Sequence, residues 1–529
     1  MEKIISKIKN SKTDFLLEVL FVVLCISIMG VLLAKSALNE SLTFDEFTHV
    51  QAGYQFLTNQ DFRYDPFNPP LARELVSAPV IFGIEKLNDP LLFYSRAVSI
   101  LTTLLLAVLV YIIAKNLYGR RSAFFALLFL IFEPNILANG HYAGEDMIFT
   151  FFFILNIYVF WKWKYSFSKP KLALFGLLTG LTLSTKFSAL PFLFFCFLIT
   201  FLYEKKNRQE ILKRTYWVKK YVYPLIFILF LALSLWGTYF FTLQPLLGYR
   251  FDPNRFALSY KNNPLVGFAL NFPLPLGSYI STIKQQISYN YTAFYTKNTY
   301  FYGNISTSGL PGIFLIPLLF IKIPIPLILM FLSSFFYFKK TKKDIFILIA
   351  LSLILFLSSI SKTIIVLRYV LPIIPLVIIY SSKAANFSKN KVLAYGFVTF
   401  LLLWEISNTL SVYPFYISFY NEFAGGYENG YKYAVDSNYD WGQGLIALSK
   451  FQKQNKIDNL YLDYFGSVDP KTYGVDYKQL SINSFPKNKN LTLAISASCY
   501  YFCGYYKLSY LAGKKPERII GGSILIFNN

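Results

Sequence analysis

Long apolar runs separated by short polar segments fill most of the chain. A helix needs about 20 apolar residues to cross the hydrocarbon core of a bilayer, and about eleven runs approach or exceed that length. We place them near residues 15–37, 91–114, 122–138, 147–163, 171–185, 188–203, 222–243, 308–338, 344–360, 364–381 and 391–413. The pattern therefore predicts an all-α polytopic membrane protein with about eleven transmembrane helices.

The pattern changes after Tyr413. A helical periodicity runs from Trp441 to Asn455, and strand-like segments follow at Leu460–Phe465, Leu491–Ile495 and Ile524–Phe527. Strands alternating with helical stretches predict a small α/β domain. We therefore expect two domains, a transmembrane domain with outer loops 38–90 and 244–307, and a C-terminal domain: residues 1–413 and 414–529.

The charge distribution predicts the topology. The chain has a formal net charge of +23, yet its lysines and arginines gather in short segments between apolar runs. This is the positive-inside pattern, which assigns the N-terminus and the basic loops to the cytoplasm and residues 414–529 to the outer face. The same placement excludes nucleic acid as a partner, and we expect a multi-pass protein of the cell membrane.

A long polar interval, residues 42–79, follows the first apolar run. It holds Asp45, Glu46 and His49, and it contains a rigid Asn68-Pro69-Pro70-Leu71 turn. Loops of this length are usually functional or disordered, and the many aromatic residues in this interval argue against disorder.

A second acidic pair, Glu145-Asp146, precedes the fourth predicted span. Each pair lies four residues from one of the two histidines, His49 and His141, so short helices would bring each histidine to a carboxylate. One interpretation is a general base acting on a hydroxyl acceptor, and another is a histidine–carboxylate metal site. A third is that these residues are helix caps at the membrane boundary.

Cations are few on the same side of the predicted membrane. Arg63, Arg73, Arg96, Lys186 and Arg368 lie in or just inside the outward-facing ends of the predicted spans. An ionisable residue at the end of a span is costly, and a bound phosphate would repay that cost; snorkelling to lipid headgroups is the alternative. Lys322 lies in an Ile-Lys-Ile-Pro-Ile-Pro segment that breaks the eighth span, so a substrate groove could pass there.

Four cysteines are present. Two lie inside apolar runs. Cys499 and Cys503 lie in the predicted outer domain, where a disulfide could persist, and the sequence leaves their pairing open.

The residues together resemble the GT-C glycosyltransferases that use polyprenyl-phosphate sugars, in the branch of protein O-mannosyltransferases and the aminoarabinose transferase of lipid A. The resemblance covers most of the membrane region and the start of the C-terminal domain. It rests on Asp45-Glu46 with His49 and Gly53, Asn68-Pro69-Pro70-Leu71, Arg96, Asp146, Gly180–Lys186, Lys322-Ile323-Pro324, Arg368-Tyr369 with Pro372, and Ser437–Gln443.

The resemblance implies an inverting transferase that moves a sugar from a polyprenyl-phosphate carrier to a lipid, glycan or protein hydroxyl. Asp45 would be the base, with Glu46 and Asp146 in the acceptor site. Phosphate contacts would come from Arg96, with Arg368 and Lys186. The remaining candidate substrate contacts are His49, Arg63, Asn68, Arg73, His141, Glu145, Lys322 and Tyr369.

Two departures from the family pattern stand out. Where the aminoarabinose transferases have a lysine before the two prolines and an arginine three residues after the aspartate, this chain has Asn68 and Thr48. The interval 244–307 is also too short for the β-trefoil of the protein mannosyltransferases. These departures leave the sugar and the acceptor open.

No cofactor is required for such a reaction, because cations can neutralise a prenyl-phosphate leaving group. The chain has no glycine-rich phosphate loop after a strand, and a divalent metal has no specific spacing in its support. The expected partners are the lipid-linked donor, the hydroxyl acceptor and membrane lipids. The rival interpretation is a polytopic transporter or flippase, for which repeated halves and charges near the membrane midplane would be typical.

Overall fold

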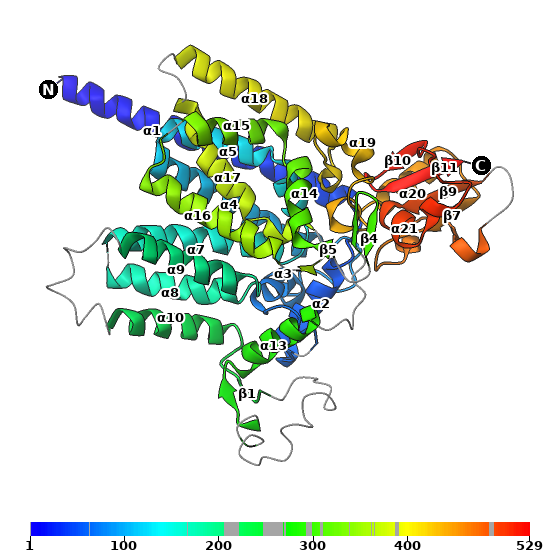
Figure 1. Ribbon diagram of the computed structural model, residues 1–529, viewed down its shortest axis with the longest axis horizontal. Helices are drawn as coiled ribbons and strands as arrows, with labels where there is room; N and C mark the ends of the chain where they lie inside the picture. Colours follow the sequence, from blue (N-terminus) through cyan, green and yellow to red (C-terminus); the bar gives the residue numbers. More distant parts are fainter. Residues whose placement is uncertain are drawn as a thin grey trace.

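The computed structural model describes most of the chain. The described residues are 2–62, 64–166, 168–205, 222–246, 268, 271–291, 299–306, 310–337, 339–360, 362–363, 366–386, 391–485 and 491–528. They form a body of helices lying side by side, with a small sheet-containing region at the end where the C-terminus lies (Figure 1).

Helices occupy most of the predicted apolar runs. Their bounds are α1 Glu2–Asn39, α4 Phe93–Tyr118, α5 Arg120–Ile131, α7 Asp146–Ser166, α8 Lys169–Leu183, α9 Ala189–Lys205, α10 Tyr223–Gly237, α14 Leu315–Lys322, α15 Ile325–Tyr337, α16 Lys342–Ser359, α17 Ile373–Ser381 and α18 Lys391–Ser411. Among the described residues, three helices are long and apolar enough to cross a membrane: Thr13–Asn39, Phe93–Tyr118 and Asp146–Lys164. The bent pair α14–α15 raises this to four if it counts as one span.

Prolines interrupt two of the predicted runs. The run 122–138 divides into α5 and a short α6, Pro134–Asn139, whose first turn is capped by Glu133 Oε2, the acceptor of the Ile136 N–H at 2.6 Å. The run 308–338 bends by 105° between α14 and α15, where Pro324 stands. Proline cannot donate the backbone hydrogen bond that a continuous helix needs, so these runs are broken helices.

The polar interval 42–79 is folded into two packed helices, α2 Glu46–Asn59 and α3 Leu71–Ile81. A Cβ atom on Gly53 would lie 2.1 Å from the carbonyl oxygen of Arg73, so only glycine allows the two helices to approach this closely. Ser77 Oγ donates to the carbonyl of Val50 at 2.7 Å and ties α3 to α2.

Further short elements lie beyond α10. They are α13 Gly277–Tyr291 and the two-stranded pairs β1 Leu243–Gln244 with β2 Leu274–Pro275, β3 Thr299–Phe301 with β4 Asn304–Ser306, and β5 Leu310–Pro311 with β6 Lys362–Thr363.

The C-terminal region contains a five-stranded sheet in the order β10-β11-β9-β7-β8. The strands are β7 Leu460–Asp463, β8 Lys478–Gln479, β9 Thr492–Ser496, β10 Arg518–Ile520 and β11 Ile524–Asn528. β7 runs parallel to β8 and β9, and the other pairings are antiparallel. The helices α20, Leu445–Gln454, and α21, Ala497–Phe502, accompany this sheet. The strands and the helix predicted from periodicity are confirmed here.

The C-terminal region also holds the segment that leads into α2. The Ser41 N–H donates to the Gln443 carbonyl at 3.1 Å, and the Phe44 N–H donates to the Trp441 carbonyl at 2.9 Å. The backbone immediately before Asp45 is therefore positioned by residues about 400 positions later in the chain.

Candidate active site

Asp45 stands at the first turn of α2 but does not cap that helix with its side chain. Its Oδ2 accepts a hydrogen bond from Arg368 Nη1 at 2.9 Å. The Asp45 side chain keeps 31% of its surface exposed, against 14% for Arg368. The interpretation of Asp45 as a simple helix cap is therefore wrong, and its carboxylate is directed toward a cation and solvent.

Arg368 extends the contact to a second acidic pair. Its Nη1 lies 3.8 Å from Asp146 Oδ2. Lys186, which follows α8, hydrogen-bonds to Asp146 Oδ1 and lies 3.5 Å from Glu145 Oε1. We call these five residues the charged cluster: Asp45, Glu145, Asp146, Lys186 and Arg368.

Burial shapes the protonation of the cluster. Desolvation lowers the pKa of Lys186, but the carboxylates of Asp146 and Glu145 outweigh it and leave the pKa raised, so the ammonium stays charged. Desolvation raises the pKa of Glu145, which the positive charge of Lys186 only partly opposes.

Aromatic rings flank the two cations. The Arg368 guanidinium carbon lies 4.2 Å from the centroid of the Trp441 ring, and Lys186 Nζ lies 5.0 Å from that of Tyr369. Such contacts stabilise a desolvated cation. Asp436 adds a further, partly buried acid, whose pKa is raised by desolvation although Arg368 opposes the shift. The Ser437–Gln443 motif carried the resemblance, but no role in the site was predicted for Trp441 or Asp436.

Two polar atoms of the cluster point at nothing that the structure describes. Within the described residues, Arg368 Nε and Glu145 Oε2 are buried and have no hydrogen-bond partner. A buried donor without a partner costs roughly 1–3 kcal/mol. An acceptor atom on a substrate would remove that cost at Arg368.

Arg96 and Glu46, which were expected to contact the substrates, pair with each other. The Arg96 guanidinium pairs with Glu46 through Nε–Oε1 and Nη2–Oε2 contacts, both 2.8 Å. Its remaining N–H groups donate to the carbonyls of Ala37, Glu40 and Ser41 at 2.7–2.9 Å. All five guanidinium N–H groups are thus used, and the side chain is fully buried.

This geometry contradicts a phosphate contact by Arg96, because no donor is left for a ligand. Glu46 is likewise engaged: it also accepts from the Thr43 N–H and hydroxyl and from the Ala143 N–H, at 2.8–3.0 Å. Burial raises the pKa of Glu46, yet the charge of Arg96 outweighs it and holds the pKa below its usual value. The pair fixes the loop that carries Asp45 instead of touching a substrate.

His49 contacts Arg73 and not the Asp45 side chain. Its Nδ1 accepts from Arg73 Nε at 3.3 Å, and Arg73 Nη2 lies 2.8 Å from Asp65 Oδ2. Burial and the neighbouring Arg73 lower the pKa of His49 to about 3, so the ring is neutral. The expected i,i+4 side-chain pair is replaced by this His49–Arg73–Asp65 chain.

His141 is turned away from Glu145. Its Nε2 lies 3.0 Å from Glu40 Oε2, which also accepts from the Tyr142 hydroxyl at 2.7 Å, and its Nδ1 faces the Leu137 carbonyl. The predicted His141–Glu145 contact is therefore wrong. Glu40, which sequence reasoning passed over, is the buried partner that holds the ring.

Lys322 does not line a groove. Its ammonium donates to the carbonyls of Ile417, Phe419 and Asn438 at 2.7–2.9 Å, which uses all three N–H groups. The residue is buried and joins the break between α14 and α15 to the C-terminal region, so the expected substrate contact is contradicted.

Two predicted substrate contacts remain. Asn68 is partly buried in the turn before α3, where the Leu71 N–H donates to the Ser184 carbonyl at 3.0 Å and brings the turn near Lys186. Arg63 lies outside the described residues.

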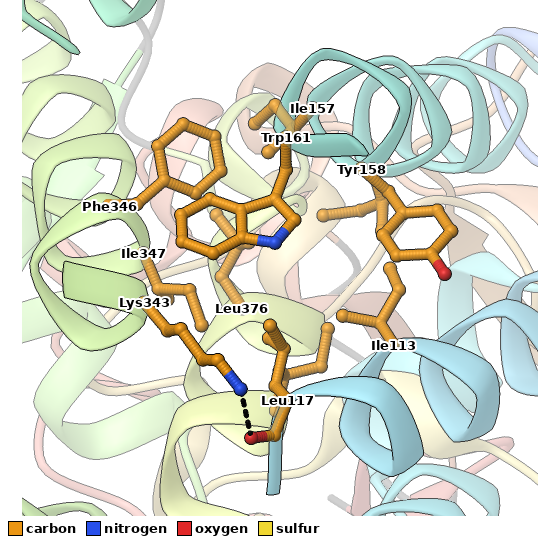
Figure 2. A pocket seen from close by; sticks show the side chains of 11 residues that line it. Ile113, Leu117, Ile157, Tyr158, Trp161, Lys343, Phe346, Ile347 and Leu376 are labelled. Carbon is orange, nitrogen blue, oxygen red and sulfur yellow. Dashed lines mark hydrogen bonds between the residues drawn. The ribbon is translucent and has the colours of Figure 1, made fainter. Parts of the chain in front are cut away.

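A separate pocket lies between α4, α7, α16 and α17 (Figure 2). Its lining is mainly apolar, with Trp161 and Phe346 among its walls, and Lys343 Nζ donates to the Leu117 carbonyl at its edge, at 3.1 Å. The α7 residues that line it begin at Ile154, roughly 12 Å along the helix from Asp146. No member of the charged cluster lines this pocket.

Three comparisons with known proteins bear on the chain. Residues 22–245 match the sequence model of the dolichyl-phosphate-mannose-protein mannosyltransferase family. An uncharacterised protein of Aquifex aeolicus is 30% identical over 144 residues, which are 26% of this chain and 27% of that protein.

Among solved structures, ArnT from Cupriavidus metallidurans in its apo state superimposes with a TM-score of 0.51 at 11% identity, over 98% of both chains. The same protein bound to undecaprenyl phosphate gives 0.49 at 13% identity, over 96% of this chain and 97% of that one. The predicted resemblance is thus confirmed: the chain has the fold of the GT-C glycosyltransferases, and its N-terminal part matches a mannosyltransferase family that uses a polyprenyl-phosphate sugar.

Proposed function

We propose that this protein is an integral membrane glycosyltransferase that transfers a sugar from a polyprenyl-phosphate carrier to a hydroxyl acceptor, with inversion at the sugar carbon. The family match and the shared fold support a glycosyltransferase and do not favour the transporter. The observation that carries the proposal is the hydrogen bond between Asp45 and Arg368, in a cluster that combines a partly exposed carboxylate with a less exposed arginine and a buried lysine.

In the proposed reaction, the acceptor oxygen forms a bond to the sugar C1 as the bond from C1 to the phosphate oxygen breaks. The acceptor proton passes to the Asp45 carboxylate, and the bonding electrons leave with the prenyl phosphate. Asp45 suits the role of base because its side chain is more exposed than those of the other acids in the charged cluster. The exposed fraction is 31% for Asp45 and 9% for Asp146.

The leaving phosphate is proposed to lie against Arg368 and Lys186. The Nε–H of Arg368, which has no partner among the described residues, is available to a phosphate oxygen while Nη1 still contacts Asp45. One guanidinium can therefore hold the donor and the base in a single arrangement. These cations supply the positive charge that the leaving group needs, so the proposal includes no divalent metal.

The arrangement in the membrane is part of the proposal. We infer about eleven crossings, with the N-terminus in the cytoplasm and residues 414–529 as an extracytoplasmic domain. The short apolar helices support further crossings beyond the three long ones, among them Ala189–Thr200, Tyr223–Gly237 and Ile373–Asn386. The charged cluster would then open on the outer face of the cell membrane, where a lipid, glycan or protein acceptor can reach it.

The test is sugar transfer by the full chain in reconstituted vesicles that contain a polyprenyl-phosphate sugar. Asp45→Asn keeps the size of the side chain and should abolish transfer while leaving donor binding measurable. Asp458→Asn removes an exposed acid of the C-terminal region and should leave transfer unchanged. Transfer at the original rate by the Asp45 variant would overturn the assignment of the base.

A further inference from the structure

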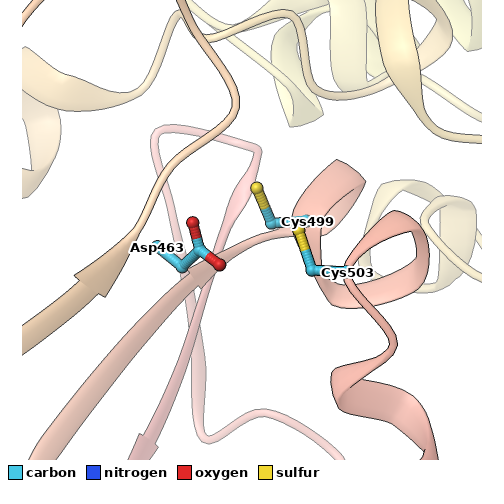
Figure 3. Close-up of side chains that lie close together, drawn as sticks. All are labelled: Asp463, Cys499 and Cys503. Atoms are coloured by element: carbon cyan, nitrogen blue, oxygen red, sulfur yellow. The ribbon is translucent and has the colours of Figure 1, made fainter. Parts of the chain in front are cut away.

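A cluster of metal-ligating side chains lies in the C-terminal region, apart from the charged cluster. It consists of Asp463, the last residue of β7, with Cys499 in α21 and Cys503 directly after that helix. One carboxylate oxygen and the two sulfur atoms all lie within 4.8 Å of one another. Figure 3 shows both thiols projecting from the side of the helix that faces Asp463.

The spacing of the cysteines distinguishes a metal site from a disulfide. The Cys503 N–H donates to the Cys499 carbonyl at 2.9 Å, so the two residues are separated by one full helical turn. Residues four apart on a helix have Cβ atoms about 5–6 Å apart. A disulfide needs its Cβ atoms about 3.5–4.5 Å apart, so oxidation would require the end of α21 to unwind.

A metal ion bridges the same two sulfurs without that change. Zinc–sulfur bonds of about 2.3 Å place two thiolates of a tetrahedral site nearly 4 Å apart, which agrees with the observed upper limit of 4.8 Å. The third ligand is the Asp463 carboxylate. Cys499 is buried and Cys503 is exposed, so the fourth position of the metal faces solvent.

The carboxylate is already oriented by a neighbour. The Tyr505 hydroxyl donates to Asp463 Oδ2 at 2.8 Å, and Tyr505 is fully buried. Such outer contacts fix ligating groups and are part of most metal sites. Two thiolates and one carboxylate are a donor set that suits a borderline-soft cation.

From this arrangement we propose that Asp463, Cys499 and Cys503 bind a zinc ion that joins β7 to α21. The site would hold the sheet and the helix in register next to Ser496 and Ser498, which donate hydrogen bonds to the Asp440 carboxylate and carbonyl. Asp440 immediately precedes Trp441, whose ring lies against Arg368. The metal would therefore stabilise the wall of the candidate active site without touching a substrate.

The experiment measures zinc bound per chain. The full protein, purified in detergent under reducing conditions without a histidine tag, is equilibrated with Zn²⁺ alone, desalted and analysed for metal content. The unchanged chain should bind one zinc per chain. Cys503→Ser, which alters an exposed side chain, should bind none, and Cys196→Ser, a cysteine of α9, should still bind one.

A second variant covers the case in which the cysteine variant fails to fold. Tyr505→Phe keeps all three ligands and should weaken zinc affinity about 10–100-fold. Substitution of Co²⁺ for zinc should produce a thiolate charge-transfer absorption in the unchanged chain and not in Cys503→Ser. Equal zinc content in all variants would show adventitious binding and overturn the proposal. In protein purified separately without reductant, a mass lower by two hydrogens than that of the reduced chain would show a disulfide and also overturn the proposal.

Discussion

Arg368 and Asp45 are 323 residues apart in the chain, yet Arg368 Nη1 donates to Asp45 Oδ2 at 2.9 Å. The contact joins the start of α2 to η3, the 3-10 turn Leu367–Val370 that precedes α17. Asp45 would thus take a proton from the acceptor beside the cation that is proposed to receive the leaving phosphate. If Asp45 is the base and Arg368 contacts the phosphate, as proposed, deprotonation of the acceptor and departure of the phosphate would depend on the same ion pair.

Arg368→Gln should reduce kcat/KM for sugar transfer by roughly 10²–10³-fold, because one preorganised charged donor is lost from the transition state. Arg368→Lys should recover only part of this loss, because an ammonium cannot contact Asp45 and phosphate in a fixed fork. The measurement is steady-state transfer in vesicles. Arg518→Gln, at an exposed arginine of β10, is the matched control, and an equal loss in that variant would contradict the prediction.

Arg96→Gln should unfold the protein more readily and should not weaken donor binding. Breaking a buried ion pair by removing one partner costs about 3–5 kcal/mol, and the Glu46 carboxylate would be left buried. Thermal unfolding in detergent measures the loss.

The control for Arg96 is Arg120→Gln, since Arg120 pairs with Glu18 at 3.1 Å but is 40% exposed. An exposed pair contributes about 0–1 kcal/mol. A raised KM for the donor, with unchanged thermal stability, would instead indicate that Arg96 contacts the donor phosphate.

Lys322→Met should lower the thermal midpoint sharply, because three buried carbonyls would lose their hydrogen-bond donor. The expected cost is roughly 3 kcal/mol or more. The donor KM of the protein that remains folded should not change. Lys340→Met, at an exposed lysine, should have no measurable effect on either quantity. Normal stability with a weakened donor affinity would indicate a substrate groove at Lys322 after all.

The buried carboxyl of Glu74, in α3, should make the free energy of unfolding depend on pH. Burial raises the pKa of its carboxyl from 4.5 to about 8. The folded state therefore keeps the proton while the unfolded state loses it, so the free energy of unfolding falls as pH rises from about 4.5 to about 8. Glu74→Gln cannot ionise and should remove this slope.

The measurement for Glu74 is the thermal midpoint at pH 5 and at pH 8. The gain of Glu74→Gln over the unchanged chain should be larger at pH 8. Glu428→Gln changes an exposed acid and should leave the pH profile as it was. A gain from Glu74→Gln that is the same at both pH values would refute the explanation.

Much of the architecture could be predicted from local patterns. Apolar runs gave the positions of most helices, and the alternation near Leu460, Leu491 and Ile524 located the strands of the C-terminal sheet, because both depend on near neighbours. The break at Pro134 was the main local error, whereas the break of the eighth span at the proline-containing segment around Pro324 was predicted and is confirmed. The run 122–138 is apolar enough to resemble a single helix, although Pro134 begins a second one.

The site was predicted in part, and its errors have one cause. Asp45, Asp146, Lys186 and Arg368 come together as residue types suited to the chemistry. Arg96 and Lys322 carried the same signal, a cation at the end of an apolar run, but their donors are used within the protein. The position of a cation in the sequence indicates that its charge needs a partner. It does not indicate whether that partner is a substrate or another group of the protein.

The sequence alone predicted a membrane protein and identified its two carboxylate pairs and the cations near the ends of its apolar runs, because hydropathy and charge are properties of each segment. Only the tertiary structure decided which cation meets which carboxylate. Glu46 lies next to Asp45 in the chain, yet one is closed off by Arg96 and the other is open beside Arg368. Partners 50 and 323 residues away made that difference, through contacts that no local pattern contains.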